Sequence, residues 1–99
     1  MVLEHAVITV RPGTHREFEA AVAEGRRHIA DSPGFRSFAL HRGVEREDEY
    51  VLLVEWDHLD DHLTGFRGSA AFPAWRALVG PFFASPPDGT HLVPVEGLA

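Results

Sequence analysis

The chain has 99 residues, which suits one domain, and we expect residues 1–99 to form one unit with a folded core over about 3–95. Hydrophobic residues make up 44% and charged residues 24%, which is typical of a globular protein and excludes a disordered one. Nine arginines against fifteen acidic residues give a net charge of −6, so we expect no nucleic-acid partner and no membrane partner.

The N-terminal region predicts a strand followed by a helix. β-Branched and apolar residues over 3–11 predict the strand, and Pro12-Gly13 predicts a tight turn after it. Thr14 and Glu17 match a capping box, in which a hydroxyl and a carboxylate accept hydrogen bonds from free N–H groups at a helix start. Apolar residues then recur every three or four positions, which predicts a helix up to about Asp31. These residues are Phe18, Ala21, Val22, Gly25 and Ile29.

A β-hairpin is predicted next. The segments 35–42 and 50–56 are rich in apolar, aromatic and β-branched residues, as is typical of strands. Between them, the segment 43–48 is too charged to bury and predicts an exposed loop.

Two helical segments follow the hairpin. Asp57 can cap a helix over 58–66, and glycines weaken this helix until Ser69 offers a new cap. An amphipathic segment over 69–79 ends at Gly80-Pro81, because proline cannot continue a helix. We therefore expect the helical region to break once.

The last residues predict a loop over 81–90 and a strand over 91–95. Pro94 cannot donate a hydrogen bond to a neighbouring strand, so this strand is expected at a sheet edge. The resulting order, β-α-β-β-α-β, indicates the α+β class and a ferredoxin-like split βαβ fold with an antiparallel sheet.

Both faces of the predicted sheet are apolar. A sheet with one wet face alternates apolar and polar residues, yet the segments 6–8 and 51–54 are apolar throughout. A second copy of the chain is the simplest cover for the second face. We therefore expect a homodimer in which the two sheets pack face to face.

Several short features follow one another along most of the chain. They are the segments 10–14, 33–35 and 66–72, Trp56 at the end of a predicted strand, and His62 in the next helix. In order and spacing, the chain resembles the antibiotic biosynthesis monooxygenase (ABM) family. The resemblance implies a dimeric α+β barrel. Members of this family catalyse different reactions, so the fold alone does not fix the function.

The resemblance also implies candidate site residues. A cofactor-free family member that oxidises anthrone-type polyketides uses a Trp at the end of strand three, an Asn earlier on that strand, a Tyr on helix two and an Arg on the next helix. Trp56 and Arg76 stand at the Trp and Arg positions. His62 and Leu52 stand at the Tyr and Asn positions. Trp56, His62 and Arg76 are therefore the predicted catalytic residues.

This chemistry needs a base and a cation. An electron-rich phenol that has lost a proton can pass one electron to O2 without a metal or flavin. His62, with a pKa expected near neutrality, suits the proton step, and Arg76 can stabilise the phenolate and the superoxide. We predict a cofactor-independent monooxygenase that acts with O2 on a small phenol, quinol or anthrone, in an aromatic slot. The candidate substrate-binding residues are Leu52, Phe66, Phe72, Trp75 and Tyr50.

Structural interpretations of the same residues stay open. Aromatic residues at helical spacing are also typical of a hydrophobic core. His62 can be a solvated side chain, Arg76 can pair with Asp60 or Asp61, and Tyr50 can pack at the rim of the sheet. The alternative function is a non-oxygenase barrel that binds, isomerises or cyclises a small aromatic metabolite. A third is a module that serves only for dimerisation.

We expect no metal and no cofactor. A chain without cysteine has no thiolate site. His58 and His62 have the spacing of a metal pair, with Asp61 beside them, but the Glu of a zincin motif is missing. Haem-degrading members carry an iron-binding His where this chain has Trp75 and Arg76. The N-terminus lacks the pattern of a signal peptide, so a cytoplasmic location is expected. No role is predicted for His5, His28, His41 and His91.

Overall fold

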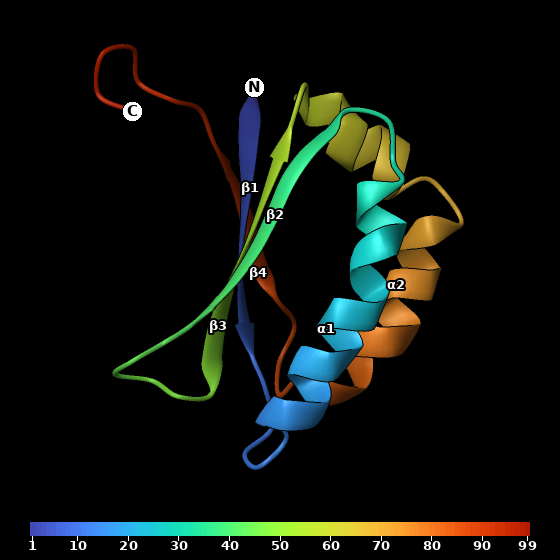
Figure 1. Cartoon of the computed structure of the whole chain (residues 1–99), viewed down its shortest axis with the longest axis vertical. Coiled ribbons are helices and arrows are strands. Elements are labelled where there is room, and N and C mark those ends of the chain that lie inside the picture. Colours follow the sequence, from blue (N-terminus) through green and yellow to red (C-terminus); the bar gives the residue numbers. More distant parts are fainter.

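The computed structural model describes residues 1–99 and contains a four-stranded antiparallel sheet with helices on one face (Figure 1). The strands are β1 (Val2–Thr9), β2 (Phe35–Arg42), β3 (Glu49–Trp56) and β4 (Asp88–Leu92). The helical segments are α1 (His15–Ala30), the π-helical turn η1 (Asp61–Phe66), α2 (Ala71–Val79) and the 3-10 turn η2 (Gly80–Phe82). The strand order β2-β3-β1-β4 confirms the predicted ferredoxin-like α+β fold.

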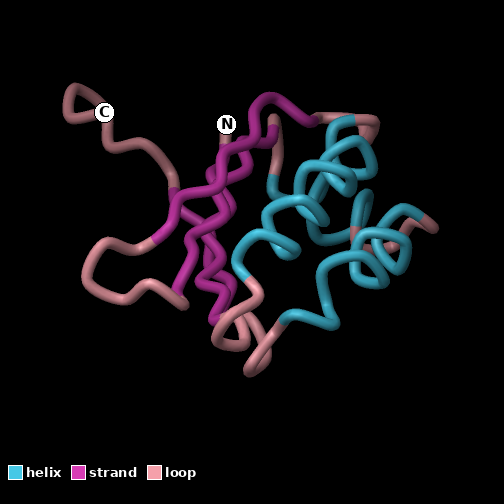
Figure 2. The backbone as a smooth tube through the Cα atoms, turned by 60° about the horizontal axis from the view of Figure 1, so that its bottom comes forward, coloured by secondary structure: helices cyan, strands magenta, loops and turns pink.

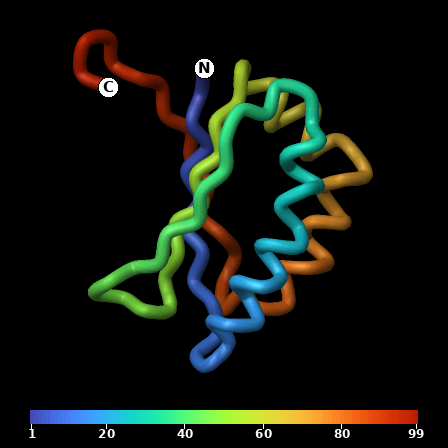
Figure 3. The backbone as a smooth tube through the Cα atoms, viewed as in Figure 1, coloured from blue at the N-terminus to red at the C-terminus, as the bar shows by residue number.

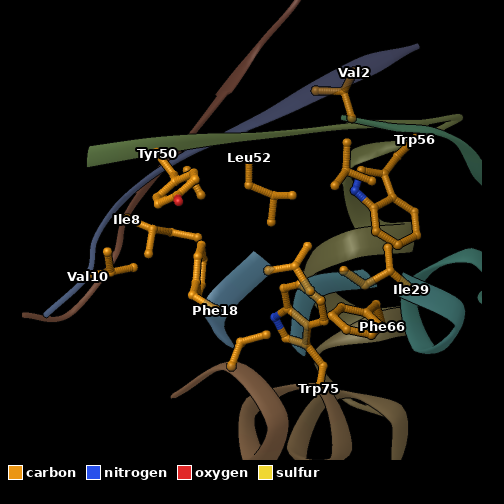
Figure 4. Packing of buried hydrophobic residues seen from close by; sticks show 14 residues of the cluster. Val2, Ile8, Val10, Phe18, Ile29, Tyr50, Leu52, Trp56, Phe66 and Trp75 are labelled. Atoms are coloured by element: carbon orange, nitrogen blue, oxygen red, sulfur yellow. The ribbon is translucent and has the colours of Figure 1, made fainter. Parts of the chain in front are cut away.

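The core lies between the sheet and the helices, which gather on one side of the strands (Figure 2). Side chains alternate between the two faces of a strand, so every second residue of β3 points inward. These inward residues are Tyr50, Leu52, Val54 and Trp56, each at most 3% exposed. The helical stripe predicted for α1 is confirmed, because Phe18, Val22, Gly25 and Ile29 are buried. Figure 4 shows Tyr50 and Trp56 at opposite ends of this core, with Leu52 between them.

Gly25 allows the two helices to approach each other. A Cβ atom at this position would lie 2.8 Å from Cε3 of Trp75, which is closer than real Cβ contacts. The missing side chain therefore lets the Trp75 indole pack against α1. The indole also meets the ring of Phe38 edge to face at 6.2 Å. These contacts fix Trp75 between the helices and the sheet.

The start of α1 differs from the prediction. The hydroxyl of Thr14 donates a 2.6 Å hydrogen bond to the carbonyl of Arg11 and accepts none from the helix. The expected capping box with Glu17 is therefore wrong. Gly13, with a φ of 81°, makes the tight turn that precedes the helix. The first strand also ends at Thr9, two residues earlier than expected.

The second helical segment starts later than predicted. Asp57 does not cap it, because no side-chain hydrogen bond caps the segment and the carboxylate of Asp57 lies 3.7 Å from the guanidinium of Arg36. Leu59 and Asp60 are α-helical, and a π-helical turn follows from Asp61, in which the N–H of Arg67 donates to the carbonyl of His62 at 3.0 Å. The segment therefore holds one more residue per turn than the predicted α-helix.

The predicted helical break is confirmed, and the next helix begins at Ala71, two residues after the expected start at Ser69. The backbone N–H of Ala71, the first residue of α2, donates to the hydroxyl of Ser69 at 3.2 Å. Ser69 thus satisfies one of the free N–H groups that every helix start exposes.

The last strand lies three residues earlier than predicted, at 88–92 in place of 91–95. It pairs with β1 so that Leu92 faces Leu3. Pro94 cannot donate to the ladder, so pairing ends before it. The strand lies at the sheet edge, as predicted, and takes in the last three residues of the expected loop.

The outer face of the sheet, opposite the helices, is covered by no other element of the chain (Figure 3). Its centre carries the half-buried apolar residues Leu3, Val7, Val51 and Leu53. The C-terminal tail (residues 93–99) leaves the sheet edge, and Val93, Val95 and Leu98 are exposed on it. No helix has the length and apolar character needed to cross a bilayer.

Candidate functional site

A cavity of about 400 Å³ lies between the inner face of the sheet and α2. Its volume is within the range of small-ligand sites. The walls combine apolar and aromatic surface with four charged side chains and one imidazole. The lining residues are Glu4, Ala6, Ile8, Leu52, His62, Arg67, Phe72, Trp75, Arg76, Phe83, Pro87, Asp88 and Gly89.

Gly89 keeps one wall of the cavity open. It pairs with Ala6 across β1 and β4, so the two smallest lining residues lie side by side. A Cβ atom at Gly89 would meet no other atom within 4 Å. The edge of the cavity is therefore set by the absence of a side chain on β4.

Glu4 is an acidic residue on the inward face of the sheet. It stands between Val2 and Ala6 in the alternation of β1, and only 13% of its side chain is exposed. The indole N–H of Trp56 donates a 3.0 Å hydrogen bond to Oε1 of Glu4. Trp56 itself is fully buried, so this bond ties the carboxylate of β1 to the end of β3.

His62 lies between Glu4 and His91. Its Nε2 atom is 3.4 Å from Oε1 of Glu4, and its Nδ1 atom is 2.8 Å from Nε2 of His91. The imidazole stacks on the ring of Trp56, with centroids 5.6 Å apart and an angle of 17° between the planes. A His62 that is protonated on Nε2 alone can donate toward Glu4 and accept at Nδ1 from His91. Glu4, His62 and His91 thus form a connected row, which we call the Glu4 cluster.

Burial changes the proton affinities within the Glu4 cluster. Desolvation, followed by the charges of His91 and Arg67, lowers the pKa of His62 to about 4. The pKa of His91 is lowered by the same causes, burial and Arg67. Burial raises the pKa of Glu4, although the hydrogen bond from Trp56 and the charge of Arg67 oppose the shift. The expected near-neutral pKa of His62 is therefore wrong, because water is excluded from its ring.

Two arginines line the same cavity. The guanidinium carbon of Arg67 lies 5.5 Å from the centre of the Phe72 ring, and that of Arg76 lies 5.9 Å from it. Arg76 also lies 5.4 Å from the centre of the Phe83 ring. Neither arginine is within 4.0 Å of a carboxylate, so the alternative ion pairs of Arg76 with Asp60 or Asp61 are not formed. Stacking on aromatic rings leaves the N–H groups available to a ligand.

The structure brings five of the eight predicted site residues to the cavity. These are His62, Arg76, Leu52, Phe72 and Trp75. Trp56 does not line the cavity but donates a hydrogen bond to Glu4, which does. Phe66 is buried beside Trp56, with ring centroids 6.0 Å apart.

Tyr50 lies at the other end of the core. It is 1% exposed, so it does not form a rim, and its hydroxyl donates to Oε2 of Glu19 at 2.6 Å. Burial and this hydrogen bond raise the pKa of Tyr50 to about 12. Tyr50 does not line the cavity of the Glu4 cluster.

Three functional candidates are absent from the prediction: Glu4, Arg67 and His91. The sequence could have indicated Glu4, because side chains alternate along a strand. Ile8 and Ala6 point inward, so Glu4, two residues before Ala6, points inward too. His91 had no such signal, because its inward position depends on the register of β4, where it faces Glu4. Arg67 follows a π-helical turn, and such a turn changes the direction of the next side chain.

The structure separates the two histidines that were considered as a metal pair. His58 is exposed and its Nδ1 lies 3.5 Å from Oδ2 of Asp61. His62 is buried and faces Glu4 and His91. The two imidazoles therefore have different partners.

Comparisons with known proteins agree on one family. The family model described as antibiotic biosynthesis monooxygenase (ABM) matches residues 1–78. A Bordetella bronchiseptica protein assigned to the antibiotic biosynthesis monooxygenases is 42% identical, with a TM-score of 0.93 over 95% of this chain and 96% of that one. The uncharacterized protein YczJ of Bacillus subtilis is 36% identical over 92% of this chain and 96% of its own length.

A more distant structure shares the fold. SnoaB, a cofactor-independent oxygenase from Streptomyces nogalater, is 22% identical, with a TM-score of 0.83 over 98% of this chain and 95% of that one. At this identity the likeness concerns the fold alone.

Proposed function

Because the chain belongs to the antibiotic biosynthesis monooxygenase family, we propose that it is a cofactor-independent monooxygenase that acts with O2 on a small phenol, quinol or anthrone. One observation carries the proposal: a single aromatic-walled cavity holds a proton-accepting cluster and two guanidinium groups without a carboxylate partner. The fold shared with a cofactor-independent oxygenase supports it.

The proposed reaction begins with loss of a proton. For an anthrone, the methylene C–H proton passes to the Glu4 cluster, and the electron pair stays on the substrate as an enolate. The enolate passes one electron to O2, and the resulting radical and superoxide combine to form a C–O bond. The peroxide takes up a proton and eliminates water, leaving a carbonyl. One oxygen atom of O2 is thus in the product and the other in water.

The residues of the cavity suit these steps. The guanidinium of Arg76 stays charged at any working pH and can stabilise the enolate and the superoxide. Phe72 and Trp75 provide flat apolar walls for a planar ring, and Leu52 offers an apolar floor. Trp56 does not touch the cavity and holds Glu4 in place through its N–H group.

Oxygen uptake tests the proposed function. Untagged protein is mixed with naphthohydroquinones and anthrones, and uptake is compared with the spontaneous rate. We expect protein-dependent uptake that falls about 100-fold in Arg76→Gln, because one electrostatic contact to developing charge is worth about that much. Arg42→Gln is the matched control, since Arg42 is an exposed arginine outside the cavity.

A cavity-filling variant supports the same test. Gly89→Val places a side chain into the open space at β4, and we expect it to remove uptake and binding while the protein stays folded. Saturable quenching of Trp fluorescence without any oxygen uptake would favour the alternative, a barrel that binds, isomerises or cyclises an aromatic metabolite.

We also propose that two copies of the chain pair through the outer faces of their sheets. The centre of this face is apolar and uncovered, and the C-terminal tail beside it presents exposed Val93, Val95 and Leu98. Exposed apolar surface of this kind marks an interface. Light scattering should give the mass of a dimer at micromolar concentration, and a lower mass in Leu53→Lys. A wild-type monomer would contradict the pairing.

A further inference from the structure

We propose that Glu4 is the residue that removes the substrate proton, and that His62 and His91 position it. This inference rests on the proposed function and names the catalytic base within it. The geometry points to Glu4 because its carboxylate has a free oxygen at the cavity, whereas both ring nitrogens of His62 face protein atoms.

His62 has no nitrogen left for a substrate. Its Nδ1 atom is hydrogen-bonded to His91 at 2.8 Å, and its Nε2 atom faces Oε1 of Glu4 at 3.4 Å. Trp56 and Phe66 also pack against its ring, with centroids at 5.6 and 6.3 Å, and both lie on the same side of it, since their own centroids are 6.0 Å apart. A substrate that bonds directly to His62 would have to displace one of these partners.

Glu4 has one oxygen engaged and one free. The contacts from Trp56 and His62 both end on Oε1. No fully buried side-chain oxygen or nitrogen in the protein lacks a hydrogen-bond partner, and Oε2 has none, so Oε2 is not sealed in the core. Because Glu4 lines the cavity, Oε2 is the atom that a bound ligand can reach.

The surroundings of Glu4 increase its affinity for a proton. The side chain is mostly buried on an apolar sheet face, and burial disfavours the charged carboxylate. The groups that face it are His62 from η1, His91 from β4, and Arg67 after η1; Arg76 and Asp88 line the same cavity. A carboxylate that is more basic than usual is better matched to proton abstraction near neutral pH.

His62 and His91 connect Glu4 to the surface. His91 is half-buried on the edge strand β4 and faces Glu4 in the register. A proton on Glu4 can leave to His91 without crossing the cavity when His62 carries its own proton on Nδ1. Nε2 of His62 then accepts the proton from Glu4 while its Nδ1–H group donates one to Nε2 of His91. In the proposed step, the C–H bond of an anthrone breaks, an O–H bond forms at Oε2 of Glu4, and the electron pair remains on the substrate.

Hydrogen exchange in the absence of oxygen tests this role separately from oxygenation. Anthrone at a saturating concentration is incubated with the protein in D2O without O2, and loss of the methylene signal is followed by proton NMR. We expect the wild-type protein to accelerate exchange above the buffer rate, and Glu4→Gln to lower that acceleration about 100-fold. Gln is isosteric and can still accept the Trp56 N–H bond, so binding of anthrone, measured by Trp quenching, should remain.

Two further variants separate the roles. His62→Gln should keep exchange within about tenfold of the wild type but shift its pH dependence, since a positioning group alters Glu4 without replacing it. Glu19→Gln is the matched control, because Glu19 also accepts a hydrogen bond from a buried aromatic residue but lies outside the cavity. It should exchange like the wild type.

The outcomes distinguish this inference from the function on which it rests. If the wild type accelerates exchange, Glu4→Gln loses that acceleration and no oxygen uptake is seen, Glu4 remains the base and the oxygenase proposal is removed. Oxygen uptake and exchange that both persist in Glu4→Gln overturn the role of Glu4 and leave the oxygenase. The role is also overturned if the wild type does not accelerate exchange, or if His62→Gln loses all exchange while Glu4→Gln keeps it.

Discussion

The two ends of the core contain the same pairing in different surroundings. At one end the Tyr50 hydroxyl donates to Glu19, and at the other the Trp56 indole donates to Glu4. The side chain of Glu19 is 47% exposed and has Arg42 at 3.5 Å, whereas that of Glu4 is 13% exposed and has no arginine within 4.0 Å. An aromatic donor bonded to a glutamate thus forms an ordinary surface hydrogen bond where water and a cation are present. Where the glutamate is mostly buried and no cation lies within 4.0 Å, the same bond holds a carboxylate with a raised pKa.

The largest expected effect comes from acid. Burial lowers the folded-state pKa of His62 from 6.5 to about 4, so the stability from its neutral form is present above pH 6.5 and is lost as pH falls toward 4. The loss should reach about 3 kcal/mol. The raised pKa of Glu4 acts in the opposite direction, favouring the fold at low pH, and offsets part of it.

Urea unfolding between pH 4 and 7 measures this loss. His62→Gln should flatten the curve in that window. The Tyr50 hydroxyl should contribute nothing there, because its raised pKa affects stability only above pH 10, where the contribution of its neutral form is lost as pH rises toward 12. An unchanged slope in His62→Gln would show that His62 does not titrate differently in the folded chain.

Removing the indole donor should have the next largest effect. Trp56→Phe deletes the N–H group that bonds to Glu4 and should cost about 2 kcal/mol in unfolding free energy at pH 7, because a buried carboxylate loses a partner. The pKa of Glu4 should rise further, since this bond lowers it. Infrared spectra of protein with labelled glutamate, compared with Glu4→Gln, would follow that carboxyl group.

The matching change at the other end should cost less. Tyr50→Phe deletes the hydroxyl donor to Glu19, and we expect a loss of about 1 kcal/mol. Glu19 keeps water and Arg42 as partners, so no charge is left unsatisfied. Equal losses in Tyr50→Phe and Trp56→Phe, measured by the same urea titration, would mean that burial is not what separates the two ends.

The smallest effect is expected for Arg42, the cation beside Glu19. Arg42→Gln removes an exposed contact at 3.5 Å, and such pairs contribute less than about 0.5 kcal/mol. Thermal unfolding should shift by only a few degrees at most, and less at high salt. A loss above 1 kcal/mol would give Arg42 a structural role that its exposure does not indicate.

The fold was predictable because its signals are local. The apolar spacing of α1 and the apolar runs of the central strands are properties of neighbouring residues, and they reappear as the buried stripe and the inward faces. The errors occur where a longer-range contact decides. The last strand follows its pairing with β1 and ends before Pro94, although its own sequence is more apolar three residues later.

The site was predictable only in part, for a related reason. Arg76, Trp75 and Phe72 lie on one helix, so their common direction follows from its period. The Glu4 cluster joins one residue from each of β1, η1 and β4, and its members meet only after the sheet has formed. The lowered pKa of His62 has the same origin, since no sequence pattern shows how much water the neighbouring strands exclude.

The π-helical turn at η1 has a consequence for comparisons among relatives. One additional residue in a helical turn rotates everything after it by about 100° relative to an α-helix. His62 and Phe66 both face the core, as residues four apart also do in an α-helix, and the additional residue places Arg67, which follows them, at the cavity. A relative that is one residue shorter between Asp57 and Ser69 would turn a different side chain toward Glu4. Chain length in this short segment should therefore separate relatives that share this chemistry from those that share only the fold.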